Sequence, residues 1–212
     1  IEIGWYMKMA TEVGGDYYDY RVDGDRLILV LGDATGHGMQ AGTLVTATKS
    51  LFQSLTEAEN LAVTLTKMSN NLKSMNLGRT GMALTMVELD GRHLRYCPAG
   101  IPPILIYRAR EQQVEEGQSG GLPLGLTDLG LYQEAEVTLH QGDAVLLMSD
   151  GLPERINAAQ EEFGYERVQD LFLQVVEEAP ANICKLMAAG GDEWAGNAEQ
   201  EDDVSFVVLR AL

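Results

Sequence analysis

The sequence predicts an α+β fold in which the sheet is mostly antiparallel. Strand-like and helix-like stretches come in blocks, not in the strict alternation that is typical of a parallel sheet. Two pairs of strand-like stretches are joined by an Asp-Gly dipeptide, at Asp23-Gly24 and at Asp90-Gly91, which is a strong signal for a β-hairpin. The 212 residues suit one large domain. Because the chain opens at Ile1 and enters the first hairpin almost at once, we expect a single domain, residues 1–212, excised from a longer protein.

The first hairpin places two aspartates side by side. Residues 17–22 are aromatic and β-branched, and residues 26–31 form a compact apolar run, so both stretches are expected to be strands. When the ribbon folds at Asp23-Gly24, Asp16 at one free end meets Asp33 at the other. Five glycines flank the pair: Gly14, Gly15, Gly32, Gly36 and Gly38.

Two neighbouring carboxylates need a compensating charge. At about 4 Å they repel by roughly 4 kcal/mol with an effective dielectric constant near 20, so one must take up a proton or a cation must bind between them. The glycines favour a cation, because they let the backbone approach a small ligand closely. From the hairpin alone, the alternative that both aspartates merely cap turns is equally open.

The rest of the chain divides into further strands and helices. A short strand is predicted over residues 1–9, and apolar residues at a helical period predict helices over residues 40–55 and 61–75, the second capped by Asn60. Two more helices are predicted over residues 164–178 and 181–189. The remaining predicted strands are residues 81–89, 92–97, 104–108, 131–139, 144–148 and 204–210. Breaks or loops are predicted at residues 98–100, 111–121 and 190–201.

The composition restricts the partners of the protein. The net charge of −17 makes nucleic acid and anionic membranes poor partners, and no apolar run reaches the roughly 18 residues of a membrane span. Cys97 and Cys184 are too few for a disulfide framework, and we expect no signal peptide. We therefore expect a protein of a reducing compartment, the cytoplasm, that contacts neither nucleic acid nor membrane through this domain.

Four aspartates have the same kind of place in the predicted fold, because each lies where a predicted strand begins or ends. They are Asp16, Asp33, Asp150 and Asp202. The small residues Ala34 and Gly151 follow two of them, so a main-chain carbonyl is accessible there as well. Carboxylate and carbonyl oxygens are hard ligands that suit Mg²⁺ or Mn²⁺ better than Zn²⁺. No metal-ligand spacing relates the three histidines, His37, His93 and His140.

Other catalytic schemes find little support in the sequence. No serine lies in a GxSxG nucleophile elbow, neither cysteine has an acid-base partner nearby in sequence, and the glycine-rich residues 32–38 lack the lysine of a phosphate loop. Metal-assisted chemistry remains. Two divalent ions about 3.5–4 Å apart can activate a bridging water near neutral pH, and hydrolysis of phosphate esters is the usual use of such a site.

Six stretches, in this order, resemble the bacterial PPM-type (protein phosphatase 2C-like) serine/threonine phosphatases: EVGGDYYDY, GDATGHG, GLPLGL, LHQGDAVLLMSDGLPE, EFGYERV and DDVSFVVL. The resemblance runs from about Glu12 to Leu209 and is nearest to the SpoIIE/RsbU group, which acts on antagonists of anti-sigma factors. It implies a four-layer αββα sandwich of two mostly antiparallel sheets flanked by helices. It also implies a binuclear centre with two Mn²⁺ or Mg²⁺ ions per site.

The resemblance gives roles to individual residues. Asp16 matches a metal ligand, Asp33 matches the aspartate that bridges both ions, and Ala34 matches the residue whose carbonyl binds one of them. Asp150 and Asp202 match the ligands of the second ion. Asp16 and Asp33 are therefore the predicted catalytic residues, and all five positions are chemically intact.

Some residues depart from the family pattern or have no firm role. Asp203 lies where many relatives have asparagine, so we expect it to support the metal ligands without binding the metal itself. Asp19 is common in the family but has no assigned role, and it is equally well explained as a solvent-facing strand residue. Ile101 stands where many relatives have the histidine of an Ala-Gly-His stretch. The first motif also lacks the arginine that clamps phosphate in many eukaryotic members. The candidates to replace it are Arg79, Arg155 and Lys49.

Together these features predict a metal-dependent protein serine/threonine phosphatase of the bacterial cytoplasm, in which a metal-bridging water attacks phosphorus directly. The expected partners are a phosphorylated STAS-domain protein that resembles an anti-sigma factor antagonist, and an upstream sensor or receiver domain of a multidomain regulator. A homodimer is compatible with this prediction. The helices after Gly38 adjoin the Asp33 segment and are the expected route of regulation. The alternatives are a non-catalytic pseudophosphatase that binds a regulatory partner and, less in keeping with the acidic surface, a metal-dependent nuclease.

Overall fold

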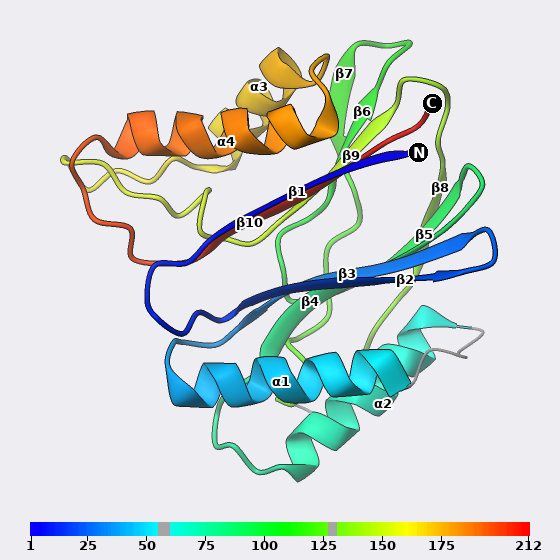
Figure 1. Cartoon of the computed structure of the whole chain (residues 1–212), viewed down its shortest axis with the longest axis vertical. Helices are drawn as coiled ribbons and strands as arrows, with labels where there is room; N and C mark the ends of the chain where they lie inside the picture. Colours follow the sequence, from blue (N-terminus) through cyan, green and yellow to red (C-terminus); the bar gives the residue numbers. More distant parts are fainter. Residues whose placement is uncertain (55–59, 127–130) are drawn as a thin grey trace. The chain divides into compact units, whose positions relative to one another are not determined.

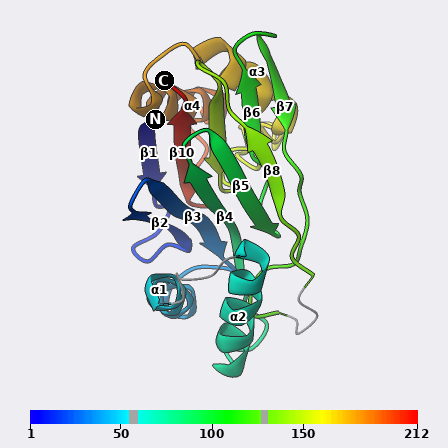
Figure 2. The same cartoon turned by 90° about the vertical axis from the view of Figure 1, so that its right-hand side faces the viewer.

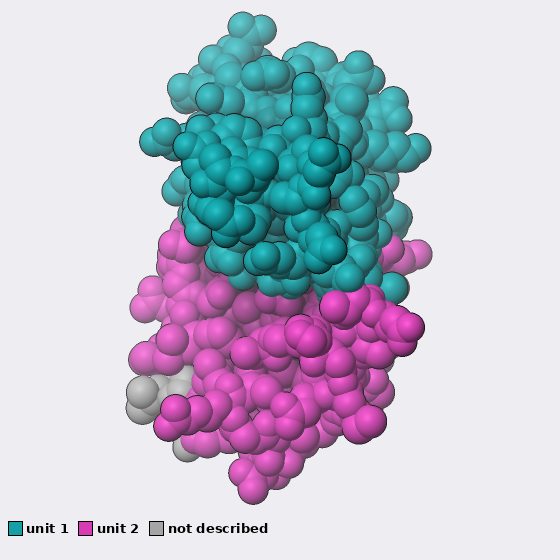
Figure 3. Space-filling view, turned by 90° about the vertical axis from the view of Figure 1, so that its left-hand side faces the viewer, with its two compact units in different colours: residues 1–10, 102–117, 139–212 teal, residues 11–101, 118–138 magenta. Residues whose placement is uncertain are grey.

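A computed structural model describes residues 1–54, 60–126 and 131–212, and these residues form two antiparallel sheets and four helices (Figure 1). They divide into two compact units. Unit 1 comprises residues 1–10, 102–117 and 139–212, and unit 2 comprises residues 11–101 and 118–138 (Figure 3). Each unit holds one sheet and two helices. The predicted α+β class, with antiparallel sheets flanked by helices, is confirmed.

Unit 2 is built on a sheet with the strand order β2-β3-β4-β5-β8. The strands are β2 (Asp16–Asp23), β3 (Arg26–Ala34), β4 (Met82–Asp90), β5 (His93–Ala99) and β8 (Ala135–Thr138). The helices α1 (Met39–Ser54) and α2 (Leu61–Ser74) pack against this sheet (Figure 2). Their apolar faces bury Phe52, Leu65 and Met68 in the core of the unit. As predicted, Asn60 caps α2, because its side-chain oxygen accepts the backbone N–H of Val63 at 2.9 Å.

Unit 1 is built on a sheet with the strand order β1-β10-β9-β6-β7. The strands are β1 (Glu2–Lys8), β6 (Leu105–Arg108), β7 (Gln113–Glu116), β9 (Ala144–Met148) and β10 (Val204–Arg210). The helices of the unit are α3 (Tyr165–Val175) and α4 (Pro180–Ala195), and α4 packs on β1 and β10 (Figure 1). Phe172, Met187 and Phe206 lie fully buried between helices and sheet.

Both hairpin turns lie one residue later than predicted. Asp23 and Asp90 still pair with the opposite strand, so the two-residue loops begin at Gly24 and Gly91. These glycines have φ angles of 61° and 58°, a left-handed conformation that glycine adopts without the steric cost of a side chain. The shift leaves the predicted pairing of the first hairpin intact.

Two strands correct the sequence prediction. β5 continues through Pro98 to Ala99, because β8 pairs only with its first half, residues 93–96, and the missing N–H of Pro98 therefore interrupts no ladder on that side. β7 lies in the stretch that was predicted to be a loop. It is an edge strand with mostly exposed polar side chains, so it lacks the alternating apolar signal on which the prediction depended.

Other boundaries differ as well. α4 runs to Ala195 and so enters the predicted loop at residues 190–201. A Cβ on Gly190 would lie 2.5 Å from Leu171 Cδ2, and one on Gly191 would lie 2.6 Å from Leu152 Cδ1. These glycines thus serve close packing of the helix, not a loop. The strand predicted over residues 131–139 is shorter, and residue 55, predicted to end the first helix, lies outside the described residues.

Candidate metal centre

The first aspartate pair lies in unit 2, at the open end of the β2–β3 hairpin. Asp16 and Asp33 are direct partners in the antiparallel register. Asp16 is only 7 % exposed and Asp33 is half-buried. The predicted juxtaposition of these two residues is therefore present in the fold, and it follows from the position of the turn at Gly24.

Backbone oxygens complete the surroundings of this pair. A Cβ placed on Gly15 would lie 2.6 Å from the carbonyl oxygen of Ala34, 3.0 Å from Asp33 Oδ1 and 3.0 Å from the carbonyl oxygen of Gly36. Three oxygen atoms thus converge on a space that any side chain at position 15 would fill. The N–H of Ala34 donates to the carbonyl of Gly15 at 2.9 Å and holds the two segments together. An all-oxygen set of this kind fits a hard divalent cation.

The second aspartate pair lies in unit 1, where β9 ends and β10 begins. These strands are antiparallel neighbours, and Met148 at the end of β9 pairs with Phe206 near the start of β10. Burial and, after it, the negative charge of Asp202 raise the pKa of Asp150. Asp150 Oδ1 is buried and accepts no hydrogen bond from any residue that the structure describes. A cation bound here would offset both penalties on the charged form.

Close backbone packing fixes the segment that carries Asp150. A Cβ on Gly151 would lie 1.9 Å from the carbonyl oxygen of Asp203, so only glycine fits this position. The N–H of Ser149 donates to the carbonyl of Ser205 at 3.1 Å, and the N–H of Ser205 donates to Ser149 Oγ at 3.0 Å. The two strand ends are therefore held against each other by both sterics and hydrogen bonds.

Two further side chains support the segment that carries Asp202. The backbone N–H of Ala10 donates to Asp203 Oδ1 at 2.7 Å, so this buried carboxylate anchors the segment that follows β1. Gln200 Nε2 donates to the carbonyls of Asp202 and Lys8, both at 2.9 Å. No sequence pattern pointed to Gln200, because it belongs to no motif and lies in a predicted loop.

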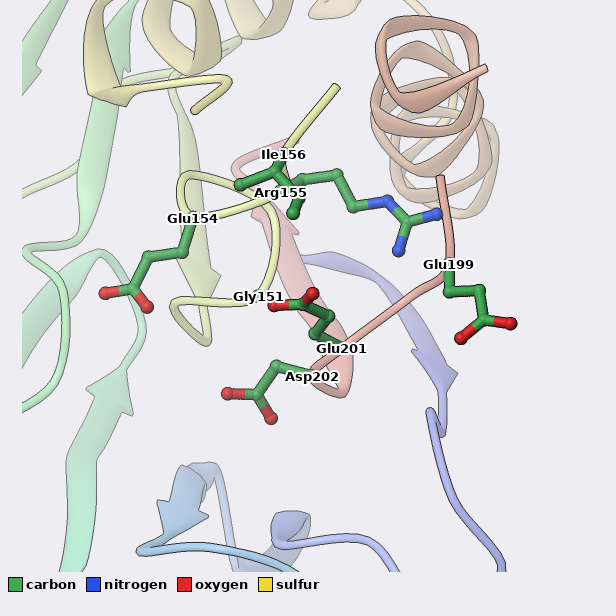
Figure 4. A pocket seen from close by; sticks show the side chains of 7 residues that line it. All are labelled: Gly151, Glu154, Arg155, Ile156, Glu199, Glu201 and Asp202. Carbon is green, nitrogen blue, oxygen red and sulfur yellow. The ribbon is translucent and has the colours of Figure 1, made fainter. Parts of the chain in front are cut away.

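A pocket of about 140 Å³ in unit 1 adjoins Asp202 (Figure 4). Glu154, Glu199 and Glu201 line it, and sequence reasoning singled out none of them. Burial is the main cause that raises the pKa of Glu154, and the charges of Asp150, Glu162 and Asp202 add to it. The only available signal was the position of Glu154 at the end of the stretch LHQGDAVLLMSDGLPE, three residues after Gly151.

Arg155 is the cationic side chain in the lining of this pocket. It extends toward the segment between α4 and β10 (Figure 4), where its Nη2 lies 3.4 Å from the carbonyl oxygen of Ala198 and 3.8 Å from Asp192 Oδ1. It therefore joins the segment that follows Asp150 to the one that precedes Asp202, which is a structural task.

Asp19 has a structural role within unit 2. Its side chain accepts hydrogen bonds from Gln53 Nε2 at 2.9 Å and Tyr17 Oη at 3.1 Å, and Lys49 Nζ lies 3.2 Å away. Burial acts to raise the pKa of Asp19, but these donors and the N–H of Tyr20 outweigh it and lower the pKa. Asp19 thus ties α1 to β2, and the charge of Lys49 is committed to this contact.

The four aspartates predicted to bind metal form one pair in each unit. Within neither unit do the described residues gather three or more His, Cys, Asp or Glu side chains into a ready-made metal cluster. His37, in the glycine-rich loop, is exposed.

None of the helices in the described ranges is both long and apolar enough to cross a membrane.

Comparisons with known proteins agree on one family. Residues 23–212 match the family described as Stage II sporulation protein E (SpoIIE). Phosphoserine phosphatase RsbU of Bacillus subtilis (strain 168) is 24% identical over 216 residues, a match that covers 99% of this chain and 63% of RsbU. The chain therefore spans less than two thirds of the length of this relative.

Solved structures share the fold. The SiaA-PP2C domain of Pseudomonas aeruginosa superposes with a TM-score of 0.87 at 23% identity, covering 98% of this chain and 85% of that one. The RsbU and RsbW domains of Rv1364c from Mycobacterium tuberculosis give a TM-score of 0.85 at 25% identity, covering 99% of this chain and 59% of that one. Both likenesses extend over nearly the whole chain.

Proposed function

Because this chain belongs to the SpoIIE family, we propose that it is a metal-dependent protein serine/threonine phosphatase. The observation that carries the proposal is the pairing of aspartates at strand ends, Asp16 with Asp33 in unit 2 and Asp150 with Asp202 in unit 1. The similarity to phosphoserine phosphatase RsbU supports phosphoserine as the group that is hydrolysed.

In this proposal the four aspartates and the carbonyl of Ala34 would hold two Mn²⁺ or Mg²⁺ ions. The oxygen-only surroundings of Gly15 and the buried Oδ1 of Asp150 fit such ions. Bound ions of this kind would supply Lewis-acid chemistry, which would activate a water molecule for attack on phosphorus and offset charge on the phosphoryl oxygens.

The other residues of the chain hold these ligands in place. The β2–β3 register keeps Asp16 beside Asp33, and the close contact at Gly151 keeps the Asp150 segment against the start of β10. Asp203 and Gln200 restrain the backbone around Asp202 through Ala10 and Lys8. Such preorganisation reduces the rearrangement that is needed when charge develops on the substrate.

The proposal extends to the substrate and the regulatory partners. We propose a phosphorylated STAS-domain substrate that resembles an anti-sigma factor antagonist, and an upstream sensor or receiver domain that controls activity. Regulation would pass through α1, because the N–H of Gly38 donates to Val13 at 3.0 Å and the N–H of Gly42 donates to Gly38 at 2.9 Å. A movement of α1 would therefore pull on the segment that follows Asp33. A cytoplasmic location and a homodimer remain predictions.

Turnover of p-nitrophenyl phosphate and of a phosphoserine peptide tests the function. We expect hydrolysis that depends on added Mn²⁺ or Mg²⁺, stops with EDTA and is lost in Asp33→Asn. A folded protein that binds the phosphopeptide but shows no metal-dependent turnover would support the pseudophosphatase alternative instead.

A further inference from the structure

A second pocket, of about 200 Å³, lies in unit 2, and the charged residues that line it among the described ones are basic. It is formed where α2 ends, by the residues that follow the helix and by Gly125 and Leu126. Its charged lining consists of Lys73 and Arg79, and no carboxylate lines it among the described residues. In this respect it is the opposite of the glutamate-lined pocket of unit 1.

The segment between Asp33 and Glu88, which supplies most of the pocket lining, is poor in acidic residues, whereas Asp128 follows the lining residue Leu126 by two positions. Between Asp33 and Glu88 the only acidic residues are Glu57 and Glu59, although the whole chain has 32 acidic residues and a net charge of −17. The basic residues of the same segment are Lys49, Lys67, Lys73 and Arg79. A negatively charged group of a partner is repelled by most of this protein but not by this segment.

Arg79 is the basic side chain of the pocket that is available for a ligand. It is exposed, and no hydrogen bond or ion pair joins its side chain to another described residue. Lys73 lies in the last turn of α2, where a cation offsets the partial negative charge of the helix end. Lys49 and Arg155, the other candidates for an anion-binding role, already contact Asp19 and Asp192.

The pocket is anchored to the strand ends that carry Asp33. The N–H and the hydroxyl of Thr35 both donate to the carbonyl of Gly81, at 2.9 and 3.0 Å, and the N–H of Gly81 donates back to Thr35 Oγ1 at 3.2 Å. The register places Asp33 opposite Ala83 on β4. The segment of Arg79 is thus fastened directly to the residues that follow Asp33.

We propose that this pocket binds an acidic side chain of the phosphoprotein substrate, close in sequence to its phosphoserine, and that Arg79 determines this specificity. The inference rests on the proposed function, since it concerns the substrate of the same site. The planar guanidinium group of arginine matches a carboxylate with two parallel hydrogen bonds. Substrate phosphoproteins with neutral or basic residues at that position would lack this contact.

The test compares two phosphoserine peptides that differ only in carrying glutamate or glutamine beside the phosphoserine. For Arg79→Gln we expect a KM about fivefold higher for the glutamate peptide, with kcat unchanged. The glutamine peptide and p-nitrophenyl phosphate should be turned over as by the wild type. The effect should shrink at about 0.5 M salt, because screening weakens an exposed ion pair.

Two controls separate the pocket from general electrostatics. Lys67→Gln removes the same charge from an exposed position of α2 outside the pocket lining, and it should leave the KM of both peptides unchanged. Arg79→Glu should prefer a peptide with lysine beside the phosphoserine, a reversal that a purely structural role of Arg79 would not produce.

Three results would overturn the inference. They are an unchanged KM in Arg79→Gln, an equal effect of Lys67→Gln, and an equal rise in the KM for p-nitrophenyl phosphate, which would place Arg79 on the phosphoryl group itself. Fluorescence anisotropy of the glutamate peptide in EDTA measures recognition without turnover. Binding that depends on Arg79 in a protein without phosphatase activity would contradict the proposed function and support the recognition site.

Discussion

The two aspartate pairs are brought together by different means. Asp16 and Asp33 face each other across one hairpin, with only β2, β3 and a two-residue turn between them. Asp150 and Asp202 are separated in sequence by α3 and α4, and they meet because β9 and β10 pair. The first pair depends on local structure, whereas the second depends on the packing of a whole unit.

The electrostatic surroundings of the pairs differ as well. The hairpin pair lies beside backbone carbonyls and is followed by a segment poor in acidic residues. The second pair adjoins a pocket lined by Glu154, Glu199 and Glu201. Without a bound cation, the aspartate pair of unit 1 therefore lies among more negative charges than the hairpin pair does. We expect the stability of unit 1 without metal to depend more strongly on pH than that of unit 2.

Replacement of the hairpin pair should have the largest effect on activity. For Asp33→Asn we expect kcat/KM with Mn²⁺ to fall by about 10³-fold or more, because the neutral amide is a poor ligand and no longer offsets cation charge. The measurement is p-nitrophenyl phosphate hydrolysis with parallel Mn²⁺ titration.

A matched control comes from the turn of the same hairpin. Asp25 is exposed there, and Asp25→Asn should keep activity within about twofold, as surface substitutions usually do. If Asp33→Asn were as active as Asp25→Asn, Asp33 would not be a ligand, and the hairpin pair would only cap the turn and strand ends.

Asp150→Asn should separate the pairs in the metal-free state. Because the pKa of Asp150 is raised, its contribution to stability is present below the ordinary carboxyl pKa of about 4 and is lost as the pH rises through the raised value. In EDTA at neutral pH we therefore expect Asp150→Asn to melt a few degrees above the wild type, while Mn²⁺ stabilises it less.

Thermal melts between pH 4 and pH 8, with and without Mn²⁺, check this expectation over roughly the range in which such carboxylates titrate. Asp170→Asn, at an exposed position of α3, serves as the control with the same change of charge. If Asp150→Asn melted below the wild type in EDTA, the charged form of Asp150 would stabilise unit 1 even without metal. This result would contradict the expected repulsion within the second aspartate pair.

The two close glycine contacts allow a comparison of stability. Gly151→Ala would place a Cβ 1.9 Å from the Asp203 carbonyl oxygen and forces the β9 and β10 ends apart, for a loss of about 3 kcal/mol. Gly15→Ala would place a Cβ 2.6 Å from the Ala34 carbonyl oxygen, a less severe overlap, so we expect a loss of about 1–2 kcal/mol. Urea unfolding measures both, and a larger loss for Gly15→Ala would reverse the assigned order of rigidity.

The sequence predicted the hairpin pair well because turn chemistry and strand period act locally. It also predicted the bounds of β9 and β10, since buried strands appear as continuous apolar runs. It did not show that these strands are neighbours, and only the resemblance to a family joined Asp150 to Asp202. Gly190 and Gly191 were misread for the same reason, because their partners Leu171 and Leu152 are distant in sequence.

The smallest expected effect concerns the tether between β2 and α1. Asp19→Asn should destabilise the protein by about 1 kcal/mol near neutral pH, since the charged carboxylate is partly exposed and screened by solvent. The pKa of Asp19 is lowered, so this contribution is present above the ordinary carboxyl pKa and is lost as the pH falls through the lowered value. The difference in urea midpoint between wild type and Asp19→Asn should thus vanish in acid, the opposite of the trend at Asp150. A difference that persists in acid would mean that Asp19 acts through its shape and not through its charge.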